Sequence, residues 1–149
     1  MMKKTILFTF LILSLILITG CGKDGGVVVD TEEVTENVVK IPLSEISEDV
    51  EFYTYNDSGV DINYFIVLGS DGIPRTAFDA CDICGGYKGY EQKGSDIYCK
   101  NCGKFFSIEG LGTKNKGYGC WPSYLHHKIE EENIIIEISD LKSNKYRFT

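Results

Sequence analysis

The sequence predicts a small, mainly β domain of antiparallel strands that carries a metal-binding insertion between its strands. Three observations favour this fold class. Apolar side chains alternate along 60–68, turn-forming residues separate short aromatic or β-branched segments, and two Cys-x-x-Cys-Gly motifs interrupt the strands. The chain has 149 residues, of which 43% are apolar and 25% charged, so we expect one globular domain rather than a disordered or fibrous chain.

The first 20 residues are typical of a bacterial lipoprotein signal peptide. Lys3 and Lys4 precede an apolar run over 6–18, which is shorter than the roughly 20 residues of a membrane-spanning helix. The sequence Ile-Thr-Gly-Cys21 resembles a lipobox, whose cysteine is lipidated and becomes the first residue of the mature chain. An uncleaved membrane anchor is the alternative. In either case we expect the remainder on the extracytoplasmic face of the cell membrane.

Residues 21–36 follow as the lipidated cysteine and a flexible linker, since they are rich in glycine and acid and show no periodicity. The folded, metal-binding domain is then 37–149. A formal net charge of −7 argues against non-specific binding to nucleic acid, so we expect no nucleic-acid partner.

The strands are predicted in order from pattern and turn chemistry. Residues 51–56 are aromatic and strand-like, and 57–59 form a turn. The alternation over 60–68 predicts a strand with one face on a core, and a second turn follows at 69–72. Residues 73–79 then extend into the first cysteine.

The C-terminal part is predicted to contain two further short strands, at 133–138 and 146–148. Helical periodicity is weak and is found only at 42–46 and 124–132.

The chemistry is predicted to lie in two motifs, Cys81-Asp-Ile-Cys84-Gly and Cys99-Lys-Asn-Cys102-Gly. A Cys-x-x-Cys turn lets two thiolates converge while the intervening backbone N–H groups point at sulfur, and the following glycine permits a left-handed turn. Two such knuckles supply four sulfur ligands, so we expect these four cysteines to hold a metal or cluster. The alternatives are two disulfides or buried thiols.

The identity of the metal stays open at this point. Four thiolates suit iron, an iron–sulfur cluster, zinc or Cu(I). The segment ahead of the apolar run has no twin arginine, so the chain is expected to be exported unfolded and to capture its ion outside the cytoplasm. That favours a mononuclear ion, or iron gathered at the surface.

Three further features surround the motifs. Cys120 is either an additional ligand, a redox thiol or a buried packing residue. His126 and His127 follow it with no assigned role. Aromatic residues near the ligands either shield a redox centre or simply pack the core; they are Tyr87, Tyr90, Tyr98, Phe105, Phe106 and Tyr118.

The motifs resemble those of one family over roughly 38–148. The segments that carry the likeness are Asp79-Ala-Cys81-Asp-Ile-Cys84, Tyr98-Cys99-Lys-Asn-Cys102-Gly and Gly-Cys120-Trp121-Pro. They resemble the FtrD-like family of membrane iron–sulfur proteins, associated with high-affinity iron uptake, where an electron-transfer part has been proposed. The resemblance implies Cys81, Cys84, Cys99 and Cys102 as ligands and matches Cys120 to the family's fifth cysteine. Larger members carry many transmembrane helices, whereas here we expect only a lipid anchor.

A fainter resemblance is to Rieske-like and to rubredoxin or zinc-ribbon sites. Rieske domains also present two short metal loops on a β domain, with a Gly/Pro loop that covers the cluster. The segment 119–122 would be that cover, although the paired histidines of Rieske ligation are absent from both motifs.

These observations lead to one preferred function and two alternatives. We expect a lipid-anchored metal-binding protein with iron or an iron–sulfur cluster, which transfers electrons or handles iron beside a membrane iron permease or redox partner. The alternatives are a structural zinc-ribbon-like binding module and a thiol–disulfide oxidoreductase. No hydrolase or kinase motif is found in the sequence, so a non-enzymatic electron carrier or metal-binding protein is favoured over an enzyme.

The ligand assignment predicts that Cys99→Ser abolishes metal binding and most of the cooperativity of unfolding, because a three-thiolate remnant no longer closes the site. Metal analysis and a thermal melt of the variant check this. Full metal occupancy with an unchanged melting curve would show that the assignment is wrong.

Overall fold

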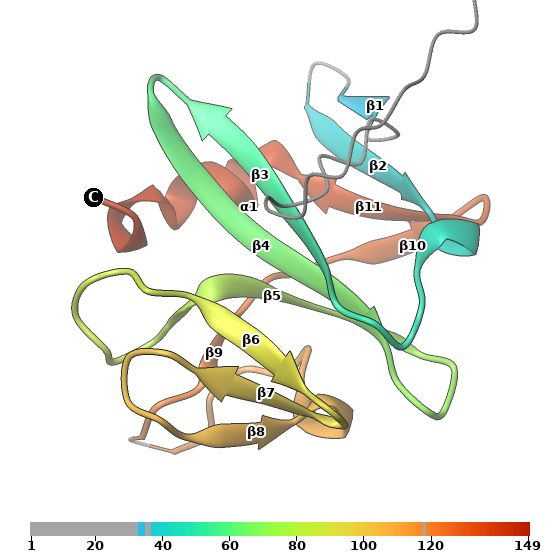
Figure 1. The fold of residues 1–149 in the computed structure, drawn as a ribbon. Coiled ribbons are helices and arrows are strands. Elements are labelled where there is room, and N and C mark those ends of the chain that lie inside the picture. Colours follow the sequence, from blue (N-terminus) through green and yellow to red (C-terminus); the bar gives the residue numbers. More distant parts are fainter. Residues whose placement is uncertain (1–32, 35–36, 118) are drawn as a thin grey trace, which may run out of the picture.

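The computed structural model describes residues 33–34, 37–117 and 119–149 and shows a mainly antiparallel β fold, as predicted (Figure 1). The predicted signal peptide, Cys21 and most of the predicted linker lie outside the described residues. Two residues of that linker, Glu33–Val34, form the short strand β1.

The described strands form three antiparallel sheets. Sheet B has the order β3-β4-β5-β9, with β3 at Glu51–Asp57, β4 at Val60–Leu68, β5 at Pro74–Cys81 and β9 at Pro122–Tyr124. Sheet A has the order β1-β2-β11-β10, with β2 at Val38–Pro42, β10 at Lys128–Glu130 and β11 at Asn133–Glu137. Sheet C has the order β6-β7-β8, at Tyr90–Lys93, Asp96–Cys99 and Phe105–Ser107.

Four short helical segments complete the described fold. The α-helix α1 covers Ile138–Ser143. The 3₁₀ turns are η1 at Leu43–Glu45, η2 at Ile108–Gly110 and η3 at Lys145–Arg147.

Sheet B is the central layer and packs on a core on each face. On one side Ile62, Tyr64 and Ile66 of β4 contact side chains of β2, β11 and α1. On the other side Phe65 and Val67 pack against sheet C. The alternation over 60–68 therefore predicted one buried face correctly, but the opposite face is buried too. All eight residues of β5 are buried for the same reason, which places its last residue, Cys81, inside the molecule.

Most of the predicted strands and turns are confirmed, and two segments are corrected. The weak helical periodicity over 124–132 does not correspond to a helix, because this segment forms the end of β9 and the hairpin strand β10. Glu131 and Glu132 both have positive φ and make the two-residue turn into β11. Turns of this kind usually contain asparagine or glycine, so two glutamates do not predict one. The strand predicted at 146–148 is also wrong, since the chain after α1 continues as η3.

Arg75 connects the central sheet to the small sheet that carries the second cysteine motif. Its buried guanidinium makes two hydrogen bonds to the Asp71 carboxylate, at 2.9 and 2.8 Å, and an ion pair of 3.0 Å with Glu109. Its Nε also donates to the backbone carbonyl of Glu109 in η2. Because η2 directly follows β8, this cation ties the two layers together.

The Asp71–Arg75 pair predicts a loss of stability in acid. The hydrogen bond from Arg75 lowers the pKa of Asp71 to about 2 from an ordinary 3.8. The ionised carboxylate therefore stabilises the fold above about pH 4, and this contribution is lost as the pH falls from 4 through 2. Urea midpoints of the wild type should fall more between pH 5 and pH 2 than those of Asp71→Asn. Parallel declines in the two chains would contradict the prediction.

Candidate metal centre

Five cysteine side chains from three loops meet at one end of sheet B. Cys81 is the last residue of β5, and Cys84 follows in the loop to β6. Cys99 is the last residue of β7, and Cys102 lies in the loop to β8. Cys120 precedes β9, whose first residue pairs with Cys81 in sheet B. Strand pairing over long sequence separations thus brings together the five described cysteines that the sequence singled out; Cys21 lies outside the described residues.

The sulfur atoms form two overlapping sets of three that share Cys84. Those of Cys81, Cys84 and Cys99 all lie within 4.8 Å of one another, and so do those of Cys84, Cys102 and Cys120. The Sγ atoms of Cys84 and Cys120 are 3.5 Å apart. Three of the four predicted ligands therefore form one mutually close set, whereas the fourth, Cys102, joins Cys84 in a second set with the fifth thiol, Cys120.

The cluster runs from the core to the surface. Cys81 and Cys99 are buried within the core formed with sheet C, Cys84 and Cys120 are partly buried, and Cys102 is exposed. One side of the cluster is therefore shielded from water, while the side that carries Cys102 is exposed.

Backbone N–H groups point at the sulfurs, as the spacing of the motifs predicts. Burial alone would raise the pKa of Cys81, but the backbone N–H groups of Ile83 and Cys84 lower it to about 7. In the second motif the backbone N–H of Lys104 helps to lower the pKa of Cys102 in the same way. The loops thus stabilise negative charge, the form of sulfur that binds a metal, on Cys81 and Cys102. Burial has the opposite effect at Cys84 and Cys99 and raises the pKa of both thiols.

The left-handed glycines of the two motifs occupy different positions. Gly103, directly after Cys102, has a φ of +72° as expected. In the first motif the residue with positive φ is Gly86 rather than Gly85, so the expected turn comes one residue later. The carbonyls of both Gly85 and Gly86 accept hydrogen bonds from the Asn101 side chain, which joins one knuckle to the other.

The third loop is fastened to the first motif. The backbone N–H of Asp82 donates to the Trp121 carbonyl at 3.0 Å, and Ser123 donates to the Asp82 carboxylate at 2.7 Å. The Trp121 ring packs edge-on against Phe106, and its Nε1 donates to the Thr113 carbonyl. These contacts hold Cys120 beside Cys84.

Asp79 was not predicted as part of the site, although its carboxylate accepts hydrogen bonds that hold the loop after the first motif in place. Its carboxylate accepts hydrogen bonds from the Tyr87 hydroxyl and the Tyr90 backbone N–H, both at 2.6 Å. Burial raises the pKa of Asp79 to about 6 despite these donors. Gly89 approaches the carboxylate so closely that a β-carbon there would collide with it. The signal in the sequence was an acidic residue within a buried strand, two residues before Cys81.

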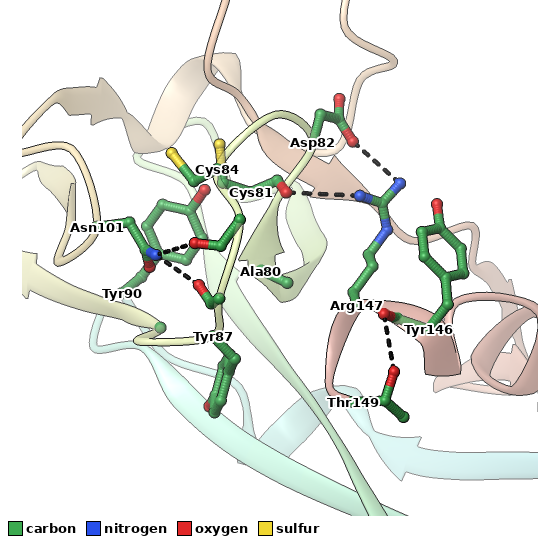
Figure 2. Close-up of a pocket in the computed structure, with 13 residues that line it drawn as sticks. Ala80, Cys81, Asp82, Cys84, Tyr87, Tyr90, Asn101, Tyr146, Arg147 and Thr149 are labelled. Atoms are coloured by element: carbon green, nitrogen blue, oxygen red, sulfur yellow. Dashed lines mark hydrogen bonds and ion pairs between the residues drawn. The ribbon is translucent and has the colours of Figure 1, made fainter.

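Tyr90 has a buried hydroxyl aimed at the cysteines. The residue is 2% exposed, and its hydroxyl has no hydrogen-bond partner among the described residues. Figure 2 shows the hydroxyl pointing toward the sulfur atoms of the labelled cysteines. Burial and then the neighbouring Cys81 and Cys99 thiols raise the pKa of Tyr90. An orphaned donor beside thiols fits a site in which those sulfurs bind a metal as thiolates.

A cavity of about 210 Å³ lies beside the first motif (Figure 2). Arg147 lines it, with its guanidinium 3.5 Å from the Cys81 carbonyl and 3.3 Å from the Asp82 carboxylate. Tyr146 and Thr149 complete the wall on the C-terminal side. The approach of residues 146–149 to the cysteine loops was not predicted, because no local pattern marks so distant a contact.

The two histidines lie apart from the thiols. His127 Nδ1 is 2.9 Å from the Thr76 hydroxyl, and burial lowers its pKa. His126 Nδ1 is 4.0 Å from the Asp140 carboxylate. Among the residues that the structure describes, the groups close enough to share a metal consist of cysteines alone. Tyr118 lies outside the described residues.

The donor set and the sequence comparison agree on the class of protein. Thiolate ligands select soft metals, zinc and iron–sulfur clusters. A family model described as "membrane iron-sulfur containing protein FtrD-like" matches residues 46–148, which include all five clustered cysteines. The chain belongs to the FtrD-like family. Neither the curated proteins nor the solved structures contain a significant match to this member. In the part of this FtrD-like chain that is described, no helix has the length and apolar character needed to cross a membrane.

The orphaned hydroxyl predicts opposite effects of Tyr90→Phe in the two metal states. In the metal-free chain the change removes an unsatisfied buried polar group, so the free energy of unfolding should rise by about 1 kcal/mol. In the metal-loaded chain it removes a donor to charged sulfur and should cost about 1.5–3 kcal/mol. Chemical denaturation of both forms checks this, and a change of the same sign in both would contradict it.

Proposed function

We propose that this FtrD-like protein is a lipid-anchored, extracytoplasmic iron protein that transfers electrons or handles iron beside a membrane iron-uptake system. In this proposal Cys81, Cys84, Cys99 and Cys102 hold an iron–sulfur cluster or iron, and Cys120 is an additional ligand or redox thiol. Cys21 carries the lipid. The family's description as membrane iron–sulfur proteins supports the coarser part of this statement.

The observation that carries the proposal is the convergence of five thiols, in two sets of three that share one sulfur. A single tetrahedral ion brings its four sulfurs into one mutually close set, whereas overlapping sets leave room for a larger centre. The lowered pKa values of Cys81 and Cys102 favour thiolates at these two positions, and the orphaned Tyr90 hydroxyl offers a hydrogen-bond donor to sulfur.

An iron centre would supply reversible one-electron chemistry here. The protein's own contribution is electrostatic and steric. The aromatic core beneath Cys81 and Cys99 excludes water from one side of the cluster, and backbone N–H groups stabilise charge on the sulfurs. The exposed Cys102 leaves a short path between the centre and a partner.

A thiol–disulfide oxidoreductase is the second candidate, because the Sγ atoms of Cys84 and Cys120 are only 3.5 Å apart and the pKa of Cys81 is lowered to about 7. Against it, neither Cys-x-x-Cys motif lies at the start of a described helix, which is where thioredoxin-like enzymes place theirs. A purely structural zinc site would use the same cysteines, and the experiment below distinguishes it by its metal and its lack of colour.

The test is anaerobic purification of the full-length chain, followed by metal analysis and a visible spectrum before and after dithionite. The proposal predicts bound iron and an absorption band that bleaches on reduction. Cys84→Ser should lose both metal and colour because its sulfur belongs to both sets of three. Cys21→Ser is the matched control, and it should keep the metal but leave the membrane fraction.

Two results would contradict the proposal. A colourless protein with stoichiometric zinc would indicate a structural module. A metal-free protein whose Cys84 and Cys120 form a disulfide under air and release it under mild reductant would indicate an oxidoreductase.

A further inference from the structure

The loops that carry the clustered cysteines are basic, although the chain as a whole is acidic. The segments 82–89, 100–104 and 112–117 contain five lysines and only one acidic residue, Asp82, while the formal charge of the whole chain is −7. The five lysines are all exposed; they are Lys88, Lys100, Lys104, Lys114 and Lys116.

These five lysines form no ion pairs with the described carboxylates, although Lys100 acts electrostatically on Asp79 and Glu91. None of them makes an ion pair with any residue that the structure describes, whereas Lys93, Lys128, Lys142 and Lys145 each do. Asp82 does not compensate them either, because its carboxylate is already paired with Arg147. The positive charge of the three loops is therefore available to an external anion.

Exposed apolar side chains and the exposed Cys102 lie in or next to the same loops as these lysines. Lys100 and Lys104 stand on either side of Cys102 in the sequence of one tight loop. Ile83 is 61% exposed within the first motif, and Phe105 is 58% exposed directly after Lys104. Because the cysteines of all three loops converge, residues within a few positions of them share one end of the molecule.

We propose that these three loops form a docking face for an acidic protein, with the apolar side chains at its centre and the lysines at its rim. Transient protein interfaces commonly have this arrangement: charges at the rim speed the association of the two proteins, and apolar contacts at the centre hold the complex together. The inference rests on the proposed function in one respect: the exposed Cys102 would then be the point of electron exchange with that partner.

A protein partner fits this face better than an anionic lipid surface. β1, the first described element of the chain, lies in sheet A, at the opposite end of the molecule from sheet C (Figure 1). A lipid anchor ahead of β1 would therefore enter the domain far from the lysines. The face also consists of tight loops and lacks an amphipathic helix, the element that commonly lies in a membrane interface.

The experiment titrates poly-L-glutamate, as an acidic probe, into the full-length chain held in neutral phosphatidylcholine nanodiscs. Trp121 is the single tryptophan of the chain and lines a shallow pocket with Lys114 and Lys116, so its fluorescence reports on the face. Binding should be strong at low salt and weaken as the Debye length falls to about 8 Å near 0.15 M.

Lys100→Glu/Lys104→Glu should weaken polyglutamate binding by at least about tenfold. Lys128→Glu/Lys142→Glu is the matched control: it makes the same change of charge on β10 and α1, and it should alter the affinity by less than about twofold. Metal content is measured in every variant, so a failure of the proposed iron site is seen separately from a failure of docking.

Three results would overturn the docking proposal. The first is an equal loss of affinity for polyglutamate in both double variants, which would show that binding depends only on the net charge of the protein. The second is metal loss in Lys100→Glu/Lys104→Glu, which would mean that the lysines serve the cluster. The third is binding to phosphatidylserine nanodiscs that requires Lys100 and Lys104 and is not displaced by polyglutamate, which would make the face a lipid contact.

Discussion

The arrangement of this domain depends on bringing five sulfur atoms together in two sets of three that share Cys84. Three loops supply them. Pairing of β9 with β5 places Cys120 beside Cys84, and the turn between β7 and β8 places Cys99 and Cys102 opposite the first motif. Metal binding would replace the repulsion between thiolates with shared attraction to a cation, which is why we expect metal and fold to be strongly coupled.

The second core explains how the site is both rigid and exposed. Sheet C adds little secondary structure, yet it buries Tyr90, Ile97 and Phe106 against the central sheet and seals the inner side of the cluster. Arg75 locks the same two layers at their other end. Water is therefore excluded beneath Cys81 and Cys99, while Cys102 opens onto a surface rich in lysine. A centre that is shielded on one side and accessible on the other is what the proposed electron transfer would require.

Much of this architecture could be predicted because its signals are local. The Cys-x-x-Cys spacing, the turns at 57–59 and 69–72 and the alternation over 60–68 each depend on neighbouring residues. The features that were missed depend on distant contacts: the second buried face of β4, the Asp79 carboxylate beneath the first loop, and Arg147 reaching Cys81 from the end of the chain. The β10–β11 turn was missed because glutamates at positive φ give no sequence signal.

X-ray absorption at the metal edge of the anaerobically purified full-length chain tests the central claim most directly. Our account predicts a first coordination shell of sulfur alone, with signal from Cys99→Ser and Cys84→Ser reduced to background. A first shell containing nitrogen or oxygen from the protein, or an unchanged spectrum in those variants, would contradict a centre built from the convergent cysteines.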